Sequence, residues 1–202
     1  DAPTIDLPDA FTFEEDGSIV ENFYGYVDDI DEDGLVLTVS DTVNIIVSIS
    51  GFEVTFGAFQ DWNGTEALTF TINDNQGRAI ATDSVDVIVT PVNDAPVLAE
   101  IGSQETSEDT SLVLTLEAID VEDDDLTFSA ISDNAQNVAA EVTGNQLTLT
   151  PAPDWNGSVN ISVSVNDGEL EDSEVFEIVV IPINDAPTID LPDAFTFEED
   201  GS

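Results

Sequence analysis

A four-residue motif, Asn-Asp-Ala-Pro, sets the spacing of this chain and constrains how it can fold. The motif spans residues 93–96 and returns at residues 184–187, and its last three residues open the chain at positions 1–3. Each internal copy follows a run of β-branched residues, so a strand should lead directly into it. Because proline fixes its own φ and biases the preceding residue towards extended backbone, we expect short, stiff linkers between successive domains.

The spacing of this motif indicates an internal repeat. Asp1 and Asp94 are 94 − 1 = 93 residues apart, and Asp94 and Asp185 are 185 − 94 = 91 residues apart. Residues 185–202 also repeat residues 1–18 without a change, which gives a longer period of 185 − 1 = 184 residues. We therefore expect one domain at residues 1–92, a second at 93–183 and the start of the next repeat unit at 184–202, cut from a longer array.

The charge of the chain excludes several classes of partner. There are 45 acidic residues against one basic residue, Arg78, and the formal net charge is −44. Nucleic acid and anionic membrane surfaces would be repelled throughout, and we expect no membrane insertion in this segment. The hydrophobic fraction of 41% is ordinary for a globular chain, so the acidity does not indicate disorder. The lack of Lys, His, Cys and Met suits an exposed extracellular polymer, because it leaves few sites for proteolysis or oxidation.

The pattern of apolar residues predicts an all-β fold. Short β-branched and aromatic runs alternate with period two between Asp, Asn and Gly turns, and no useful helical period is present. In the first module the expected strands span residues 11–13, 18–27, 35–39, 45–49, 52–56, 67–72 and 85–92. In the second they span residues 97–99, 112–116, 126–128, 138–142, 147–149, 159–165 and 175–183. About seven strands per module predict two tandem, immunoglobulin-like Greek-key β-sandwiches.

The acidic residues keep their register between the two modules, whereas the apolar residues between them differ. Glu15-Asp16, Asp61 and Asn73-Asp74 match Glu108-Asp109, Asp154 and Asn166-Asp167 at an offset of 93, and Asp29, Asp31 and Asp33 match Asp120, Glu122 and Asp124 at an offset of 91. Any one of these residues is explained by the preference of Asp and Asn for turns. The recurrence of the whole set at matched loops favours a shared ligand. Trp62 and Trp155, 93 residues apart in a shared Asp-Trp-Asn-Gly, are expected to close the same end of each sandwich.

Clustered carboxylates require a cation. Several carboxylates within about 4–6 Å repel one another by a few kcal/mol per pair at the effective dielectric constant of a protein surface. Calcium takes six to eight oxygen ligands in a flexible geometry, whereas zinc and copper favour His or Cys, which this chain lacks. Magnesium suits such loops less well, because it demands a strict octahedron and retains water. The sequence therefore predicts Ca2+ as the ligand.

These features resemble cadherin repeats, and more closely the bacterial cadherin-like and Ig-like tandem repeats of surface adhesins and extracellular matrix fibres. The resemblance lies in the Asn-Asp-Ala-Pro linkers, the early Glu of each module, the acidic loops at residues 29–31 and 120–122, and the late Asn-Asp turns. It implies cadherin-like sandwiches with calcium ions between successive domains. The Asp-Arg-Glu of animal cadherins is Asp61-Trp62-Asn63 here, and their adhesive Trp-exchange strand has no counterpart.

The resemblance also implies three sets of metal ligands. The first junction would use Glu15, Asp61, Asn93, Asp94, Asp120, Glu122 and Asp167. The second would use Glu108, Asp154, Asn184 and Asp185, completed by the next repeat unit. Asp1, Asp29, Asp31 and Asp74 would serve a junction with the preceding unit.

We therefore expect a structural calcium-binding repeat of an extracellular fibre or surface adhesin stalk, at a prokaryotic cell surface. Its partners would be neighbouring repeats of the same chain, with lateral self-association into fibres and surface glycans in addition. Two alternatives are an acidic, halophilic-type sandwich that binds a carbohydrate or protein, and a subunit of an assembling filament. An enzyme is not expected: paired carboxylates can act in glycosidases, but the acidic set recurs in both modules, whereas an active site is usually made once. The sequons at Asn63, Asn156 and Asn160 are short enough to arise by chance.

Overall fold

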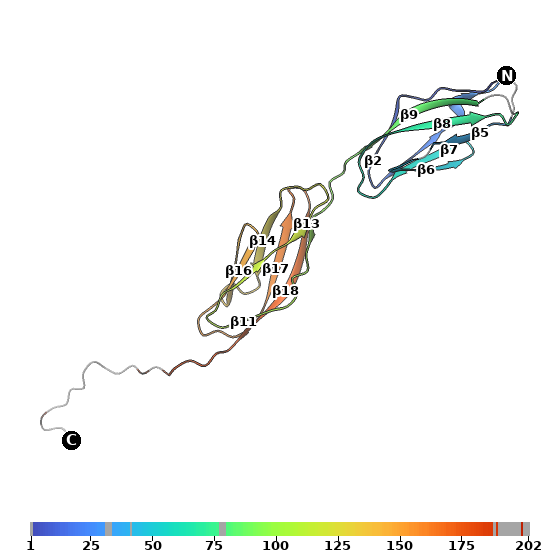
Figure 1. The fold of residues 1–202 in the computed structure, drawn as a ribbon. Coiled ribbons are helices and arrows are strands. Elements are labelled where there is room, and N and C mark those ends of the chain that lie inside the picture. Colours follow the sequence, from blue (N-terminus) through green and yellow to red (C-terminus); the bar gives the residue numbers. More distant parts are fainter. Residues whose placement is uncertain are drawn as a thin grey trace. The chain divides into compact units, whose positions relative to one another are not determined.

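The computed structural model describes residues 2–30, 34–40, 42–76, 80–187, 189 and 199. The chain divides into two compact units, Asp1–Asp94 and Ala95–Ser202. Each unit is a β-sandwich with a four-stranded sheet, a three-stranded sheet and a small two-stranded ribbon (Figure 1). The predicted all-β fold of two tandem sandwiches is thus confirmed.

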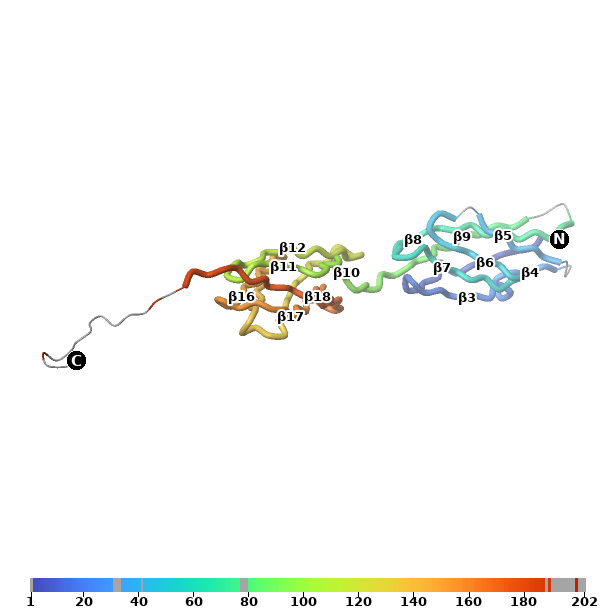
Figure 2. Tube along the Cα trace, turned by 90° about the horizontal axis from the view of Figure 1, so that it is seen from below, coloured from blue at the N-terminus to red at the C-terminus, as the bar shows by residue number. Residues whose placement is uncertain are grey.

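The first unit places its longest strands at the centre of the four-stranded sheet. That sheet has the order β2 (Ala10–Glu14), β9 (Ile80–Thr90), β8 (Gly64–Asn73) and β5 (Val36–Val39). The opposite layer has the order β3 (Ser18–Asn22), β7 (Glu53–Ala58) and β6 (Ile45–Ser50), and β1 (Thr4–Ile5) pairs with β4 (Val27–Asp28). In Figure 2, β8 and β9 lie side by side, and β3, β6 and β7 lie on the other side of the unit.

The second unit repeats this arrangement strand for strand. Its four-stranded sheet has the order β11 (Gln104–Ser107), β18 (Glu171–Ile181), β17 (Gly157–Asn166) and β14 (Thr127–Ser132). Its three-stranded sheet has the order β12 (Leu112–Thr115), β16 (Gln146–Pro151) and β15 (Val138–Thr143), and the ribbon pairs β10 (Val97–Leu98) with β13 (Ala118–Ile119).

One parallel pairing in each unit determines what lies at its end. β2 runs parallel to β9, with Phe11 opposite Val87, and β11 runs parallel to β18, with Glu105 opposite Val179. All other pairings between the described strands are antiparallel. Because parallel strands finish at the same edge of a sheet, the turn after the first long strand lies beside the segment by which the chain leaves the unit.

The two cores differ in chemistry although their frames agree. The first is aromatic: the ring of Phe23, fully buried, lies 5.7 Å from Phe11, 6.2 Å from Phe56 and 4.8 Å from Phe70 between ring centroids. The second core is mostly aliphatic, with Leu116, Leu149 and Val163 at the positions of Phe23, Phe56 and Phe70. The fold therefore needs apolar volume at these positions, not particular side chains.

Strands β1 and β13 were not expected from the sequence, and two further details depart from the prediction. The single strand expected over residues 18–27 is wrong, because a 3₁₀ helix, η1 (Phe23–Gly25), separates β3 from β4. The side chain of Asn22 caps this turn by accepting a hydrogen bond from the backbone N–H of Tyr24 at 3.0 Å. Strand β11 was not expected, since its residues Gln-Glu-Thr-Ser are polar and it joins the sheet at an edge. In the part of the chain that the structure describes, no helix has the length and apolar character to cross a bilayer.

We expect the Phe23→Ala substitution to lower the free energy of unfolding of the first unit by about 3–5 kcal/mol, because it removes a buried ring from the centre of the aromatic cluster. Tyr24→Ala is the matched control, since the side chain of Tyr24 is 74% exposed, and it should cost less than about 1 kcal/mol. Urea unfolding followed by Trp fluorescence measures both. Equal losses for the two variants would contradict the central role of Phe23.

Candidate metal sites at the ends of the sandwiches

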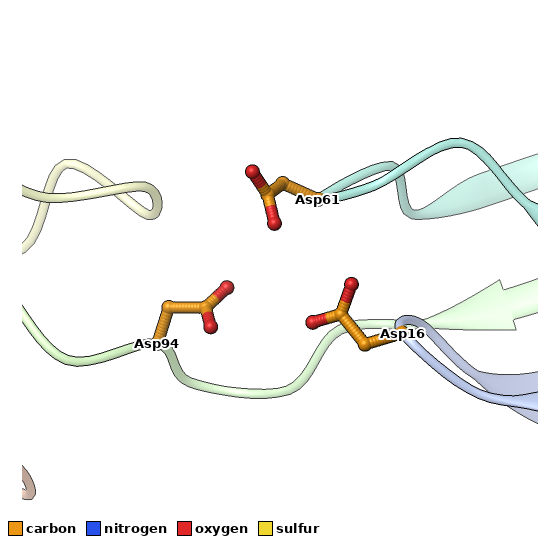
Figure 3. Close-up of side chains that lie close together, drawn as sticks. All are labelled: Asp16, Asp61 and Asp94. Atoms are coloured by element: carbon orange, nitrogen blue, oxygen red, sulfur yellow. The ribbon is translucent and has the colours of Figure 1, made fainter.

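Three carboxylates meet at the end of the first unit. Oxygens of Asp16, Asp61 and Asp94 all lie within 4.8 Å of one another, and their carboxylate groups face a common space (Figure 3). Each comes from a different segment: the turn after β2, the loop before β8 and the chain that follows β9. This is the end at which the parallel pairing of β2 and β9 places these segments.

The backbone at this cluster adopts a conformation that few residues accept. Asp16 has a φ of 59° and Asp61 a φ of 56°, both in the left-handed region. Asp and Asn tolerate that region better than other residues with a side chain, because their short polar groups can interact locally with the backbone. The turns therefore favour Asp at these positions and aim both carboxylates out of the unit.

A buried glutamate ties the exit segment to the same end. Glu15 is 3% exposed, and its Oε1 accepts a hydrogen bond from the backbone N–H of Val92 at 2.8 Å. The side-chain amide of Asn63 donates to the other oxygen, Oε2, at 3.5 Å. Asn93 adds a bond from its side-chain amide to the carbonyl oxygen of Asp94 at 3.3 Å. Glu15 therefore holds in place the segment that carries Asp94.

The second unit has the same cluster at the matching positions. Oxygens of Asp109, Asp154 and Asp185 lie within 4.8 Å of one another, and Asp109 and Asp154 again have left-handed φ values of 62° and 57°. The buried carboxylate of Glu108 accepts a hydrogen bond from the N–H of Ile183 at 2.6 Å, as Glu15 does from Val92. The same geometry therefore forms twice, in modules whose cores differ.

The electrostatics of this second cluster are those of crowded negative charges. Desolvation raises the pKa of Asp185, and the negative charges of Asp154, Glu108 and Asp109 raise it further. A carboxyl group with a raised pKa favours folding when it is protonated, and that contribution is lost as the pH rises through the raised pKa. At neutral pH the ionised cluster therefore opposes its own assembly unless a cation is present.

A tryptophan and a glycine build the loop that carries the central aspartate. Trp62 packs against the first core, and a Cβ on Gly64, which has a φ of 146°, would lie 3.0 Å from its ring. Trp155 and Gly157 repeat this contact at 2.9 Å beside Asp154. The tryptophan ring occupies the space over the glycine, so a larger residue cannot replace the glycine without moving the loop.

A second group of acidic residues lies in the loops at the opposite end of each unit. In the first unit its described members include Asp28, Asp29 and Asp74, and in the second unit residues 120–125 contain five acidic residues in six. In the second unit, Oδ1 of Asp120 accepts the N–H of Asp124 at 2.9 Å, whereas Oδ2 is shielded from solvent and accepts no hydrogen bond. A buried carboxylate oxygen in this state is costly unless a cation contacts it. Oδ1 of Asp167 accepts the N–H groups of Glu169 and Leu170, both at 2.7 Å, and Asp74 accepts that of Gln76 at 2.9 Å.

The structure brings together part of the predicted ligand set and adds two residues to it. Asp61 lies with Asp94 at the end of the first sandwich, and Asp154 lies with Asp185 at the matching end of the second. Asp16 and Asp109 complete these clusters, although the sequence analysis recorded them only as matched residues. Asp29, Asp74, Asp120, Glu122 and Asp167 lie in the loops of the opposite ends, and Asp1 and Asp31 lie outside the described residues. Asn184 repeats the bond of Asn93, from its amide to the carbonyl oxygen of Asp185 at 3.3 Å.

Other carboxylates serve the fold itself. The two oxygens of Glu66 accept the N–H groups of Val43, Asn44 and Ile45 at 2.7, 2.7 and 3.2 Å. Asp83 accepts the N–H of Leu7 at 2.7 Å, and Asp172 accepts that of Leu98 at 2.9 Å. These contacts satisfy backbone donors with charged acceptors, so the three residues have a structural role in the fold.

Family models match both units of the chain. The bacterial Ig domain matches residues 1–90, and the cadherin-like domain matches residues 92–180. No curated protein sequence matches the chain.

Among solved structures, human protocadherin-24 EC1-2 has a TM-score of 0.58 and 16% identity, over 89% of this chain and 99% of that one. Drosophila N-cadherin EC1-4 has a TM-score of 0.57 and 13% identity, over 91% of this chain and 50% of that one. An endo-fucoidan hydrolase of glycoside hydrolase family 107 is matched over 29% of its length with a TM-score of 0.40. At these identities the likeness concerns the fold. Residues 1–90 match the bacterial Ig domain model and residues 92–180 the cadherin-like domain model, so the chain is a tandem of an Ig-like and a cadherin-like domain.

Proposed function

We propose that this chain is a structural, calcium-binding repeat of an extracellular fibre or adhesin stalk at a prokaryotic cell surface. The observation that carries the proposal is the matched pair of carboxylate trios, Asp16, Asp61 and Asp94 in one unit and Asp109, Asp154 and Asp185 in the other. Each trio stands where its sandwich ends and the next linker begins. A cadherin-like and Ig-like tandem fits an adhesion or structural role of this kind.

The donor set fits calcium. Both trios offer carboxylate oxygens, and the chain contains no His, Cys or Lys. The shielded Oδ2 of Asp120, which accepts no hydrogen bond, is a further oxygen suited to a cation. A flexible coordination shell of six to eight oxygens favours Ca2+ over Mg2+ for ligands drawn from several loops.

We assign the following residues to the ions. At the first junction the trio would be supported by Glu15 and Asn93 and completed by Asp120, Glu122 and Asp167 of the following module. At the second, Glu108, Asn184 and the trio would be completed by the next repeat unit. Asp29 and Asp74, with Asp1 and Asp31 from outside the described residues, would serve the preceding junction.

The proposed role is mechanical. Two unit charges about 4 Å apart repel by about 1 kcal/mol in bulk water and about 4 kcal/mol at the effective dielectric constant of a protein surface. A divalent cation removes this repulsion and ties the exit segment, which Glu15 already anchors through Val92, to the end of its sandwich. Without the ion, repulsion acts on the segment that carries Asp94, so the linker loosens.

The distribution of charge weighs against the halophilic alternative, which expects acidic residues spread evenly over solvent-facing surfaces. The outward positions of the three-stranded sheet of the first unit contain a single carboxylate, Glu53. These positions are Ser18, Val20, Asn22, Ile46, Ser48, Ser50, Glu53, Thr55 and Gly57. The loop at positions 120–125 of the second unit is far more acidic, with five acidic residues in six. An enzyme is not proposed, since the acidic geometry forms in both units.

Calcium should stabilise the chain against unfolding. At a free concentration one hundred times the Kd, one site adds about 2.7 kcal/mol to the free energy of unfolding. The melting temperature in calcium should therefore exceed that in EDTA, and small-angle scattering should report a shorter particle in EDTA. Magnesium at the same concentration is the control and should act more weakly. Melting and dimensions that do not change after thorough chelation would defeat the proposal.

The Asp61→Asn substitution should have opposite effects in the two conditions. Asn accepts the left-handed conformation of residue 61, so the substitution removes one charge and leaves the turn intact. In EDTA the variant should melt at a higher temperature than the parent, because repulsion within the trio falls. In calcium it should bind the first ion at least about tenfold more weakly, about 1.4 kcal/mol, by isothermal titration calorimetry.

Asp86→Asn is the matched control for this experiment. Asp86 is an exposed carboxylate on β9 of the same unit, it lies outside the trio, and its loss changes the net charge equally. It should leave calcium affinity unchanged. If Asp61→Asn and Asp86→Asn alter melting and binding alike, the trio is not a metal site.

A further inference from the structure

The outer face of each four-stranded sheet contains an almost uncharged area. In the first unit it comprises nine outward positions in three adjacent rows across β5, β8 and β9, which we call the neutral patch. They are Val36, Asn73 and Ile80; Thr38, Thr71 and Thr82; and Ser40, Thr69 and Ser84. The matching positions on β14, β17 and β18 are Thr127, Asn166 and Glu171; Ser129, Ser164 and Ser173; and Ile131, Ser162 and Val175.

The charge content of the neutral patch is unusual for this chain. Among 202 residues 45 are acidic, so nine positions would contain about two on average. The first patch contains none, and the second contains only Glu171, in its outermost row. Both patches reach the edge of the sheet, because β5 and β14 are the outermost strands and are themselves without charge. Charged side chains normally guard such edges against pairing with another chain.

Four of the six hydroxyl groups of the first patch persist in the second, whereas Ser40 and Ser84 become Ile131 and Val175. Thr69, Thr71 and Thr82 become Ser162, Ser164 and Ser173. Buried residues of the same sheet differ much more, as Phe70 and Val163 show. Thr has a high β-propensity, which explains its presence on exposed strands, whereas Ser does not. Propensity alone therefore does not explain the serines of the second patch.

Apolar side chains border these hydroxyl groups and are exposed. Ile80 in the first patch is 61% exposed, and Ile131 and Val175 in the second are 71% and 62% exposed. Ile131 and Val175 flank Ser162 in a single row across three strands. A flat area with exposed apolar groups and small hydroxyl groups can pack against a like surface without leaving a charge buried.

We propose that the neutral patch is where a second copy of this chain docks, side by side with the first. Two copies with a net charge of −44 each repel one another wherever their carboxylates come within a Debye length, about 8 Å at physiological ionic strength. The neutral patch lets them approach without opposing charges at its centre. This deepens the proposed role as a fibre repeat by naming the lateral partner.

The small area of the patch predicts that a single contact between two copies is weak. In an array of repeats, many such contacts would add up. Three strands about 4.8 Å apart and five residues along each strand cover roughly 250 Å2, against about 800 Å2 per partner in a stable complex. Two patches per chain double the area, and further repeats add to it through effective concentration. Weak, reversible dimers are therefore expected for the two-unit chain.

The test is sedimentation equilibrium of the full chain, with Thr71→Glu/Ser164→Glu as the disrupting variant. It places a charge at the centre of both patches and should weaken self-association at least about tenfold. The control is Thr55→Glu/Gln146→Glu, which adds the same charges at outward positions with uncharged partners on the central strands of the opposite sheets, and it should associate like the parent. Circular dichroism confirms folding. If the disrupting variant does not fold, Thr38→Glu/Ser129→Glu on the edge strands replaces it.

A variant that strengthens association separates docking from loss of fold. Glu171→Gln removes the single charge of the second patch and should raise the association constant. Glu177→Gln, an exposed residue of the same strand outside the patch, should raise it less. A parent chain that stays monomeric at its highest soluble concentration, or a Thr71→Glu/Ser164→Glu variant that associates like the parent, overturns the proposal. Binding of dextran that depends on the patch, without self-association, also overturns it in favour of a neutral glycan.

The measurements are made in calcium and again in EDTA with about 1 M NaCl, where the Debye length falls to about 3 Å. Association in the second condition would not depend on metal binding. Failure of the calcium proposal and failure of the docking proposal are therefore distinguishable. The first would appear as a melting temperature that is the same in calcium and in EDTA, and the second as charge variants that associate like the parent.

Discussion

Repulsion among carboxylates that three separate segments bring to one end of each sandwich is the constraint on which the rest of the structure depends. The parallel pairing of β2 with β9, and of β11 with β18, forces the turn after the first long strand to lie beside the exit of the chain. Asp16 and Asp94 are neighbours for this reason, and the loop before β8 adds Asp61. The chain has one basic residue, so it contains almost no cationic side chain that could neutralise such a cluster. The topology thus creates a carboxylate cluster that a bound cation would stabilise, which is the basis of the calcium proposal.

Acidic residues have two different roles in this chain, and the number of hydrogen-bond donors around each carboxylate distinguishes these roles. Glu66 receives three backbone N–H groups and closes a loop onto β6, whereas Glu15 receives one from the exit segment and lies next to the exposed trio. A carboxylate with a full set of donors is stabilised as an anion by the protein itself. The carboxylates of each trio instead lie within 4.8 Å of one another, so they repel one another and a bound cation would stabilise them. Acidity in this chain is therefore partly structural, and the content of acidic residues overstates the number of metal ligands.

Much of the fold could be predicted from the sequence, because the apolar alternation in the central strands is strong. Strands β8 and β17 follow from it directly. Strand β11 could not be predicted, since its polar residues join a sheet edge through backbone bonds alone, and η1 depends on a local cap at Asn22. At the candidate sites, the resemblance to cadherin repeats implied Asp61 and Asp94 as ligands, whereas Asp16 was not assigned as a ligand. Its signal was present in the Glu-Asp pair that returns as Glu108-Asp109, but sequence does not say that the first residue of this pair turns inward and the second outward.

The acidic end loops and the nearly uncharged sheet faces of each sandwich are related. A repeat that concentrates carboxylates in its end loops leaves its sheet faces with few charges, and the rows around Thr71 and Ser164 contain hydroxyl and apolar groups in place of acids. End loops that demand cations and faces that lack charge are the two conditions an anionic fibre must meet. Contacts along the chain can then be controlled by divalent ions, while contacts between chains involve surfaces where ions matter less. If the acidic residues were spread over the sheet faces, two chains side by side would repel one another at every point. If the end loops lacked acidic residues, no ion would bind beside the linker in preference to any other loop. The partition of charge between ends and faces therefore connects the candidate metal sites of this chain to the proposed packing of its copies.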